Sequence, residues 1–512
     1  MASASSAPTP VSARSDRVIV VAGIGLGVLI IALTMIAGPL ASAAPVLGVA
    51  VLWLMWRIPI RYSLFALIFL GLTLECAQEI PASGLWKSPI FIIGEMLLSK
   101  ANDWTGVRPL VVTGVDCVVG YLLVVMVYRR ATGSRIDLEG QEQTAWAMAL
   151  GAFITFAGTL WVWGYGLARG GNFGNSLLQI YKLLYVPLLF FLCQAAFRGP
   201  KDHWAIAKVI LGAAIYRSLF AIFVRFVIGP TLPIELAYAT THGDSMLFAG
   251  GAGLALAMLN EGVARHSKQL TVFLVGTIGL IMFAAKANNR RVAWVEMAAL
   301  VFAFWLISDR TPLKRFVARG CMIAAPLIVM YLAIGWNSGS GIFTPVRLAR
   351  SILDSKSDTS TLWRDLENAD LIMNIQENPI LGTGLGHEYN EFITLPDVSA
   401  AFKLYRLIPH NSVLGFLAFA GVLGFTVIWC AVAVAVFLAS RAYRKSRVPL
   451  DRAMALWVIG TMIVYINSIY GDMGQGSWTA VFMVCPALAV AGKMVVACGA
   501  WPKRNGQLVN VP

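Results

Sequence analysis

Long apolar segments recur along nearly the whole chain and are separated by short polar loops. A helix needs about twenty apolar residues to cross a hydrocarbon core of about 30 Å, and these segments have that length. The pattern predicts an all-α polytopic membrane protein of about 12–14 transmembrane helices, with one large outer loop that contains short helices. Drawn as about fourteen spans, they begin near Val18, Ala41, Tyr62, Val111, Thr144, Leu178, Trp204, Met246, Leu270, Val292, Cys321, Val413, Ala453 and Thr479.

The composition agrees with this pattern. Hydrophobic residues make up 58% of the 512 residues and charged residues only 13%, and the mean hydropathy is +0.73. A chain of this length with so few charges is too apolar for a soluble protein. The 7 cysteines show neither a disulfide framework nor the spacing of a zinc site, so we expect no metal.

Basic residues predict the orientation, because Lys and Arg near the ends of spans stay on the cytoplasmic side. They gather in alternate loops, which predicts that both termini lie inside and that residues 337–409 lie outside. The net charge of +14 is then a signal of topology and indicates no nucleic-acid partner.

The same pattern predicts the organisation of the chain. Residues 1–17, rich in Ala, Ser and Pro, form a disordered cytoplasmic tail, and residues 18–336 form the bundle of spans before the large outer loop. That loop is 337–409, the remaining spans are 410–502, and 503–512 form a second cytoplasmic tail. The first apolar run lacks a convincing cleavage site, so we expect it to remain as an anchor.

Several charged residues lie inside predicted spans, where a charge costs roughly 2.5–3.5 kcal/mol on insertion scales and is kept only with a partner or a task. On the predicted topology all but Arg217, which lies near the middle, fall in the outer half. As a group they predict a polar cavity that opens outward. The alternative for any single one is a structural pair, such as Asp116 with an arginine on a neighbouring helix. The residues are Glu75, Asp116, Lys182, Arg217, Arg225 and Glu296.

The loop at residues 286–291 departs from the charge rule. It joins two spans on the predicted outer side, yet it contains Lys286, Arg290 and Arg291. Paired arginines suit phosphate, because each guanidinium offers a planar fork of donors to two oxygens. One span more or fewer upstream would instead place this loop inside, but the consistency of the other loops argues against that alternative.

The outer loop contains a predicted amphipathic helix that lies over the membrane domain. We expect Ser360 or Thr361 to cap its start and Pro379 to end it. Its apolar positions repeat at helical spacing and are Leu362, Leu366, Ala369 and Ile372 or Met373.

Two features of this loop invite a functional interpretation. Asp365 and Glu367 resemble the acidic pairs that hold a metal in soluble sugar-nucleotide transferases, but a solvated helix face is the favoured interpretation. Gly382, Gly384 and Gly386 form a G-x-G-x-G run without the strand and helix of a dinucleotide site, so we expect them to turn the backbone. The alternative is that amide groups of this turn bind a phosphate.

His410 stands where the outer loop enters the next span. Asn411 or Ser412 can cap that span, which places the imidazole beside the positive end of a helix dipole and favours its neutral form. A neutral imidazole can accept a proton from a sugar hydroxyl as a general base, provided a carboxylate or carbonyl fixes its tautomer. The alternative is an interfacial histidine that only hydrogen-bonds to the loop, an interpretation that His242 and His387 share.

Three local motifs resemble the O-antigen ligase and polymerase superfamily, membrane enzymes that transfer a glycan from an undecaprenyl-diphosphate carrier. Residues 291–294, Arg-Val-Ala-Trp, resemble the family's Ser-Arg-Gly-Ala-Trp element, with Arg291 on the family's arginine. Residues 364–386 resemble its pattern of an arginine, a short helix and Glu-Asn-Pro-hydrophobic-Leu-Gly-x-Gly. Residues 410–415 resemble its His-Asn-Ser motif, so the resemblance covers about 270–425.

The resemblance implies roles for individual residues. His410 would act as the base on the acceptor hydroxyl, while arginines would hold the carrier diphosphate as it leaves, with no metal or other cofactor. Arg290 and Val292 stand where the family commonly has serine and glycine, which leaves the donor pocket and the sugar specificity open. The candidates for the diphosphate are Arg291, Arg290, Arg225 and Arg364, and the supporting candidates are Arg217, Lys182 and Asn411.

The implied function is an inverting transfer of an undecaprenyl-diphosphate-linked glycan to an acceptor sugar hydroxyl, at the periplasmic face of a bacterial inner membrane. If the acceptor is another lipid-linked repeat unit, the enzyme is an O-antigen or exopolysaccharide polymerase, which the high number of spans favours. If it is the lipid A core, the enzyme is a ligase, and a protein side chain is a further acceptor. The expected partners are these glycans, membrane lipids, and a flippase and chain-length regulator.

Two other classes of function remain as alternatives. A flippase for the same lipid-linked sugars would explain an outward cavity of charges without catalysis, although we find no internal repeat with paired broken helices. A scaffold for a polysaccharide assembly complex would leave the charges inside the spans unexplained.

Overall fold

The computed structural model describes residues 39–74, 97–98, 100, 112–134, 136–138, 140–232, 235–310, 312–343, 346, 350, 359–395, 404–471 and 477–503. Every regular element in these ranges is a helix, and 8 helical segments are long and apolar enough to cross a membrane. The predicted all-α polytopic membrane fold is therefore confirmed. The first predicted span near Val18, Glu75 and nearly all of both predicted tails lie outside the described residues.

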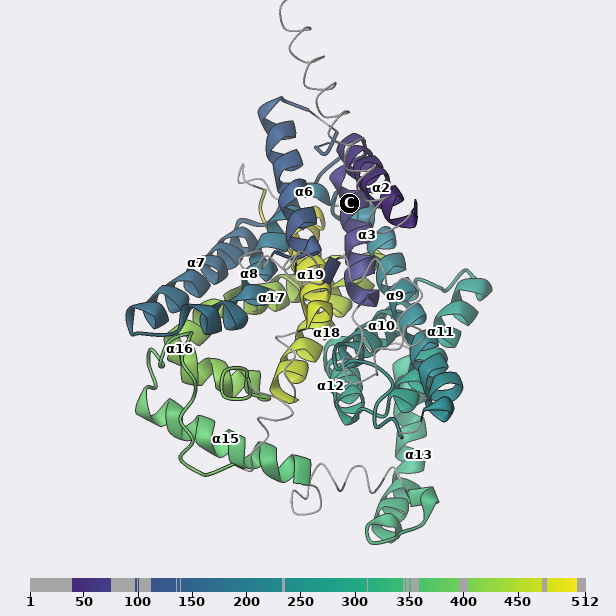
Figure 1. Cartoon of the computed structure of the whole chain (residues 1–512). Coiled ribbons are helices and arrows are strands. Elements are labelled where there is room, and N and C mark those ends of the chain that lie inside the picture. The colour runs from purple at the N-terminus through teal and green to yellow at the C-terminus, as the bar shows by residue number, and fades with distance from the viewer. Residues whose placement is uncertain are drawn as a thin grey trace, which may run out of the picture. The chain divides into compact units, whose positions relative to one another are not determined.

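The helices follow the predicted spans. The chain forms two compact units, Met1–Ser63 and Leu64–Pro512. The first contains α2 (Pro39–Arg57) and the start of α3 (Ile60–Thr73). The second, shown with α2 and α3 in Figure 1, contains α6 (Gly114–Ala131), α7 (Trp146–Ala168), α8 (Phe173–Ala196), α9 (His203–Phe223), α10 (Gly243–Asn260), α11 (Lys268–Asn288), α12 (Arg291–Ile307), α13 (Pro312–Gly335), α15 (Thr359–Glu377), α16 (Ser412–Ile428), α17 (Cys430–Lys445), α18 (Pro449–Gly471) and α19 (Trp478–Ala497).

The core of the second unit is built around α10, α18 and α19. Helix α18 packs against α10, α12, α17 and α19, and α19 packs also against α8 and is buried along nearly its whole length. Helix α10 is rich in Gly and Ala, which lets neighbouring helices approach closely. Following the predicted topology, we call the side of the outer loop the outer face and the opposite side the inner face.

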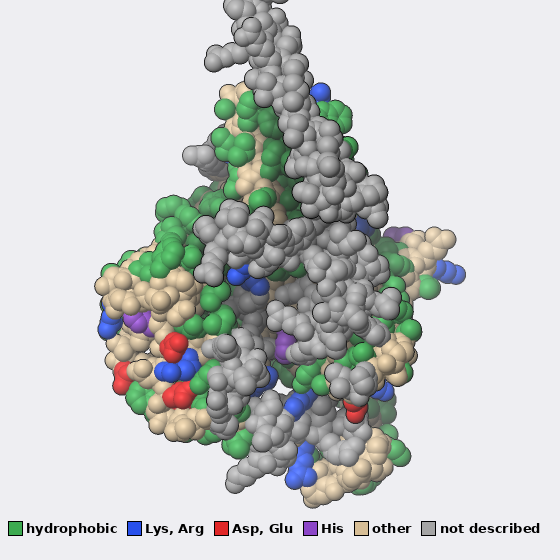
Figure 2. All heavy atoms as spheres, viewed as in Figure 1, with side chains coloured by type: hydrophobic (Ala, Val, Ile, Leu, Met, Phe, Trp, Pro, Cys, Tyr) green, Lys and Arg blue, Asp and Glu red, His purple; other side chains and the backbone are tan. Residues whose placement is uncertain are grey.

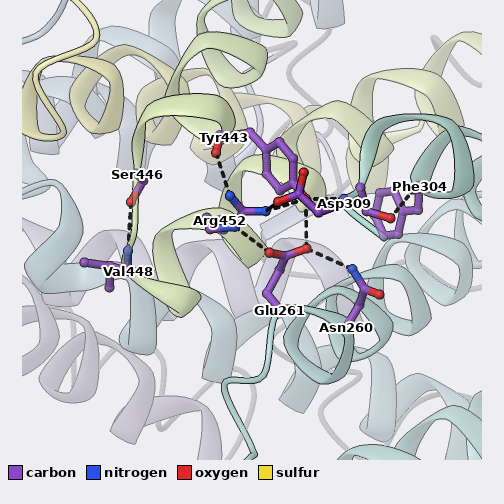
Figure 3. A network of polar contacts seen from close by, with 9 residues as sticks. Asn260, Glu261, Phe304, Asp309, Tyr443, Ser446, Val448 and Arg452 are labelled. Atoms are coloured by element: carbon purple, nitrogen blue, oxygen red, sulfur yellow. Dashed lines mark hydrogen bonds and ion pairs between the residues drawn. The ribbon is translucent and has the colours of Figure 1, made fainter. Parts of the chain in front are cut away.

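An ion-pair network at the inner face joins the ends of four helices (Figure 3). Arg452 on α18 donates to Glu261 at the end of α10 at 2.6 Å and to Asp309 just after α12 at 2.5 Å. The hydroxyl of Tyr443 on α17 donates to Glu261 at 3.0 Å, and the Arg452 guanidinium lies 4.2 Å from the centre of the Tyr443 ring. Because Glu261 is nearly buried, its carboxylate depends on these partners, and the network fixes the inner ends of α10, α12, α17 and α18.

At the outer face, helix α16 is interrupted where a loop segment enters it. Gly421 has a φ of 58° inside α16, and a Cβ there would lie 2.3 Å from the Ile380 carbonyl carbon. The amides of Val422 and Leu423 donate to the carbonyls of Pro379 and Ile380 at 2.9 and 3.1 Å. The segment after α15 therefore satisfies backbone groups that the break in α16 leaves without helical partners, as a membrane environment requires.

The glycine run continues this contact. Gly382, Gly384 and Gly386 have φ values of 68°, 92° and 96°, which confirms that they turn the backbone. The Thr383 and Gly384 amides donate to α16 carbonyls at 3.1 and 2.7 Å, and the Gly386 amide donates to the Gln179 side chain at 2.6 Å. Because these amides are occupied within the protein, the alternative interpretation as a phosphate-binding turn is wrong for them.

We expect Gly384→Ala to destabilise the folded protein by more than about 2 kcal/mol. The left-handed backbone disfavours any side chain, and a Cβ at this position would lie 2.2 Å from the Cα of Gly166. The measurement is the thermal midpoint in detergent, followed by size-exclusion chromatography. Gly276→Ala is the matched control, because Gly276 lies in α11 and a Cβ added there would have no atom within 4 Å among its surroundings. Equal midpoints for the two variants would contradict this account of the glycine run.

Candidate functional site

Helix α15 forms where an amphipathic helix was predicted, but it buries a different face. Leu362 and Ile372, predicted to face the membrane domain, are 44% and 45% exposed. The buried stripe is instead partly polar and consists of Trp363, Glu367, Asp370, Leu371 and Asn374. The predicted apolar face is therefore wrong at Leu362 and Ile372, whereas Leu366 packs against the buried apolar cluster. The interpretation of Glu367 as part of a solvated face is also wrong.

The polar side chains of this stripe bind backbone amides of the loop that follows. Asp370 accepts from the amides of Phe392 and Ile393 at 2.9 and 2.8 Å. Asn374 accepts from the Asn390 amide at 2.9 Å and donates to the Asn390 carbonyl at 2.8 Å. This is the physical reason why polar residues are buried here, since a loop packed against a helix needs partners for its backbone. Figure 2 shows acidic and basic side chains intermixed on the side where Figure 1 draws α15 and α16, which pack together.

The Glu367 carboxylate packs against both the backbone and the ring of His410. Its carboxylate is fully buried and accepts from the His410 amide at 3.3 Å and 3.1 Å, one distance for each oxygen. The Nδ1 atom of His410 lies 3.4 Å from the same carboxylate. A carboxylate beside Nδ1 favours the tautomer with the proton on Nδ1, which leaves Nε2, on the far side of the ring, as the basic nitrogen.

Two further contacts orient the imidazole. Trp363 meets the His410 ring at 4.9 Å between centroids, with the planes inclined by 73°. Asn411 is the N-cap of α16, as one of the two predicted residues, and accepts from the Leu414 amide at 3.1 Å. Its side-chain amide also donates to Asn368 on α15 at 3.0 Å. The His410 side chain is 22% exposed, so a fixed imidazole remains accessible.

Arg364 connects this part of the site with the start of α12. Its guanidinium donates to the carbonyl of Gly471, the last residue of α18, at 3.1 Å. A Cβ on Gly471 would lie 3.5 Å from the Val292 side chain, so α18 ends against the first turn of α12. Arg291 is the first residue of that helix and is half-buried. The structure thus brings Arg364 close to the turn that carries the predicted arginine pair.

Arg290 is the second arginine of that turn and is buried. It donates from Nε and from Nη2 to the Thr240 carbonyl, each at 3.1 Å, and stacks over Tyr238 at 4.0 Å from the ring centre. Its Nη1 lies 2.8 Å from Nδ1 and 2.6 Å from Nε2 of His242. Arg290 therefore spans the turn between α11 and α12 and the loop before α10.

His242 is the residue on which several predicted site residues converge. Burial is the first cause that lowers its pKa from 6.5 to about 3. Electrostatic interactions with Arg290, Arg364 and His410 lower the pKa further. An imidazole in such surroundings stays neutral at physiological pH, and a neutral imidazole can accept a hydrogen bond from a guanidinium.

The other predicted residues lie elsewhere or have other partners. Arg217 is fully buried and forms a two-pronged ion pair with Asp244. Arg225 lies in a π-helical turn and donates to the Leu236 carbonyl, and Lys182 lies over the Trp478 ring at 5.4 Å. These contacts make Arg217 part of the protein framework, while Arg225 braces the loop that leads to His242.

The suggested pairing of Asp116 with an arginine is not found among its described contacts. Asp116 accepts from the Thr113 amide at 2.6 Å, in a capping box at the start of α6, and from the hydroxyls of Tyr181 and Tyr185. The tyrosines take the place that an arginine was expected to fill, because phenol hydroxyls can satisfy a carboxylate without adding a charge.

Sequence reasoning missed the roles of Glu367 and His242. For Glu367 a signal exists, because Trp363, Glu367 and Leu371 lie four residues apart and define a helix face with a carboxylate at its centre. For His242 there is none, because its partners lie on segments distant in the chain. Within the described ranges, no group of three or more His, Cys, Asp or Glu side chains is placed to hold a metal ion.

Comparison with known proteins agrees with the motifs. No curated protein matches the chain. Residues 273–429 match the protein-family model described as O-Antigen ligase, a segment that begins in α11 and ends just after α16. It contains Arg290, Arg291, Arg364 and His410, and it nearly coincides with the range over which the sequence motifs resemble that family. Over this segment the chain is therefore similar to the O-antigen ligase family, which supports the resemblance to the O-antigen ligase and polymerase superfamily.

Proposed function

We propose that this protein transfers an undecaprenyl-diphosphate-linked glycan to the hydroxyl of an acceptor sugar at the periplasmic face of the inner membrane. The observation that carries the proposal is the buried Glu367 carboxylate against His410 at the start of α16. This is the arrangement a histidine needs to act as a general base, with one ring nitrogen oriented by a carboxylate and the other accessible.

The reaction is a single displacement at the anomeric carbon. The acceptor oxygen attacks that carbon while its proton passes to Nε2 of His410, and the bond from the anomeric carbon to the phosphate oxygen breaks with its electron pair leaving on the diphosphate. The configuration at the anomeric carbon inverts. His410 then releases the proton to water, and Glu367 stabilises the transient imidazolium without changing its own protonation state.

The diphosphate leaves toward the arginines of the outer face. Arg364 and Arg291 lie near one another at the outer end of α18, and Arg290 adds its charge from the adjacent turn. Helices α10, α12, α16 and α19 also begin at this face, and a helix N-terminus favours an anion. Arginines and helix termini that are already in place stabilise negative charge as it develops, which lowers the barrier without a step of reorganisation. We propose that Arg225 and Lys182 contribute to binding the lipid-linked glycan donor from the edge of the site.

The acceptor that we favour is a second lipid-linked repeat unit, which makes the enzyme a polymerase of O-antigen or exopolysaccharide. The high number of spans is the reason for this preference. A ligase acting on lipid A core uses the same base and the same leaving group, so it is the second candidate. A flippase would need no base, and the contact between Glu367 and His410 favours catalysis over transport.

His410→Ala and Arg291→Ala should each lower product formation by at least about 100-fold, because one removes the base and the other a ligand of the leaving diphosphate. The assay uses the purified protein with an undecaprenyl-diphosphate-linked repeat unit, alone or with lipid A core. Longer glycans indicate a polymerase and glycosylated core indicates a ligase. His266→Ala and Arg265→Ala are matched controls at exposed positions of the inner face. If the variants express normally and form as much product as the wild-type protein, the assignment as a glycosyltransferase is wrong.

Glu367→Gln should lower kcat by about 100-fold or more while KM changes little. The amide still accepts from the His410 backbone, but it loses the charge that orients and stabilises the imidazole, and Glu367 is too buried to touch substrate. Asp365→Asn removes an exposed carboxylate two residues away and should leave kcat unchanged. An equal loss of activity in the two variants would show that Glu367 acts only through the general charge of α15.

His242 predicts a dependence of stability on pH. Its pKa is about 3 in the folded protein and near 6.5 when unfolded, so below pH 6.5 the unfolded chain takes up a proton that the folded chain does not. Stability contributed by neutral His242 is therefore lost as the pH falls, by about 2 kcal/mol between pH 7 and pH 5. His242→Gln retains an acceptor for Arg290 but does not titrate. The wild-type thermal midpoint should fall more than that of His242→Gln over this range, and parallel falls would rule out the neutral, buried imidazole.

A further inference from the structure

A cavity of about 540 Å³ lies at the inner face, on the side of the molecule opposite His410. Helices α6, α8 and α19 end around it, and α7 begins there. Its lining includes Arg130 from the last turn of α6, Gln194 from the end of α8 and Lys493 from the end of α19, together with the linker before α7. The chemistry at His410 uses none of these groups.

The lining carries a net positive charge. Lys493 is 1% exposed, and its ammonium group donates to the Glu142 carbonyl at 2.9 Å. Arg130 is exposed at the rim. The one carboxylate of the lining is that of Glu142, so two cationic side chains face one anionic side chain. A buried ammonium that has a backbone carbonyl as its hydrogen-bond partner retains attraction for an anion.

Two further features show that the cavity suits a ligand with both an anionic group and a hydroxyl. Helix α7 has no side-chain cap at Ala145, and although the Ala145 and Met148 amides donate to backbone carbonyls, those of Trp146 and Ala147 have no partner among the described contacts and lie beside Thr144 of the lining. The side-chain oxygen of Gln194 is buried and has no hydrogen-bond donor among the residues described. The uncapped amides can donate to phosphate oxygens, and the Gln194 side-chain oxygen can accept from a donor such as a hydroxyl group.

The position of the cavity relative to the membrane surface indicates the source of such a ligand. Trp146, in the first turn of α7, is 59% exposed and packs against Trp501 at 5.7 Å, and Tyr128 near the end of α6 is 50% exposed. Exposed aromatic side chains at the ends of membrane helices lie at the level of lipid headgroups. Basic pockets between helices at the cytoplasmic side are suited to anionic headgroups.

We propose that this cavity binds the headgroup of an anionic phospholipid of the inner leaflet. The phosphodiester lies between Arg130, Lys493 and the first amides of α7, and a headgroup hydroxyl donates to Gln194. Phosphatidylglycerol has this combination of groups. The site is independent of the glycosyl transfer proposed above, because it shares no residue with it and lies at the other face.

The test is native mass spectrometry of the full chain in detergent, titrated with phosphatidylglycerol or phosphatidylcholine. We expect phosphatidylglycerol to bind and phosphatidylcholine to bind far more weakly. Arg130→Gln should weaken phosphatidylglycerol binding at least about fivefold, because a charge-assisted contact is lost. Arg444→Gln, at an exposed basic residue of the inner face outside the cavity, should leave binding unchanged.

A second variant and a competition experiment decide the remaining outcomes. Lys493→Gln should weaken binding as well, and because Arg130 is exposed, Arg130→Gln stays informative even where Lys493→Gln fails to fold. Glycerol 3-phosphate, added at the same concentration as the lipid, should not displace it. Displacement would overturn the lipid in favour of a soluble phosphate compound, and wild-type binding by both variants would overturn the site.

Discussion

One buried carboxylate, that of Glu367, determines the position and orientation of His410, the candidate catalytic residue. A carboxylate without exposure to water is costly unless hydrogen bonds compensate it, and the His410 amide and imidazole are the partners that the structure describes. Helix α15 therefore cannot shift along α16 without leaving a charge uncompensated. The same contact fixes the loop, the ring and its tautomer, so a single interaction joins folding to the proposed chemistry.

The second constraint is the need to satisfy backbone groups within a membrane protein. Helix α16 is broken at Gly421, and the loop after α15 supplies hydrogen bonds across the break. A second break, between α16 and α17, is bridged by the Thr155 hydroxyl, which donates to the Val427 carbonyl at 3.2 Å and accepts from the Ala431 amide at 3.1 Å. Both breaks are thus held by other parts of the chain, and the first contact fixes the segment after α15 against the break at Gly421.

The sequence predicts the helices well because length and hydropathy alone define a membrane span. It predicts α15 too, but not its buried face, since Leu362 and Ile372 follow the apolar period while the protein buries Glu367 and Asp370. The rule that apolar residues face inward assumes that the partner surface is apolar. Here the partner is a loop rich in free amides, so carboxylates are the better match. The spacing of Trp363, Glu367 and Leu371 is a local signal for Glu367. No local pattern reveals Asp370, because the amides that it binds belong to Phe392 and Ile393, well after α15. His242 was beyond prediction for the same reason, as its partner Arg290 is brought to it only by the packing of α10 against α11 and α12.

Two buried arginines, Arg217 and Arg290, have different kinds of partner. Arg217 is paired with the Asp244 carboxylate inside the protein, and the two formal charges cancel. Arg290 is equally buried, but its partners among the described contacts are a carbonyl, an aromatic face and His242, which carry no charge when the imidazole is neutral. A protonated His242 would add a second cation against Arg290 and raise the cost of holding both, so the low pKa of His242 is a condition for keeping Arg290 in place.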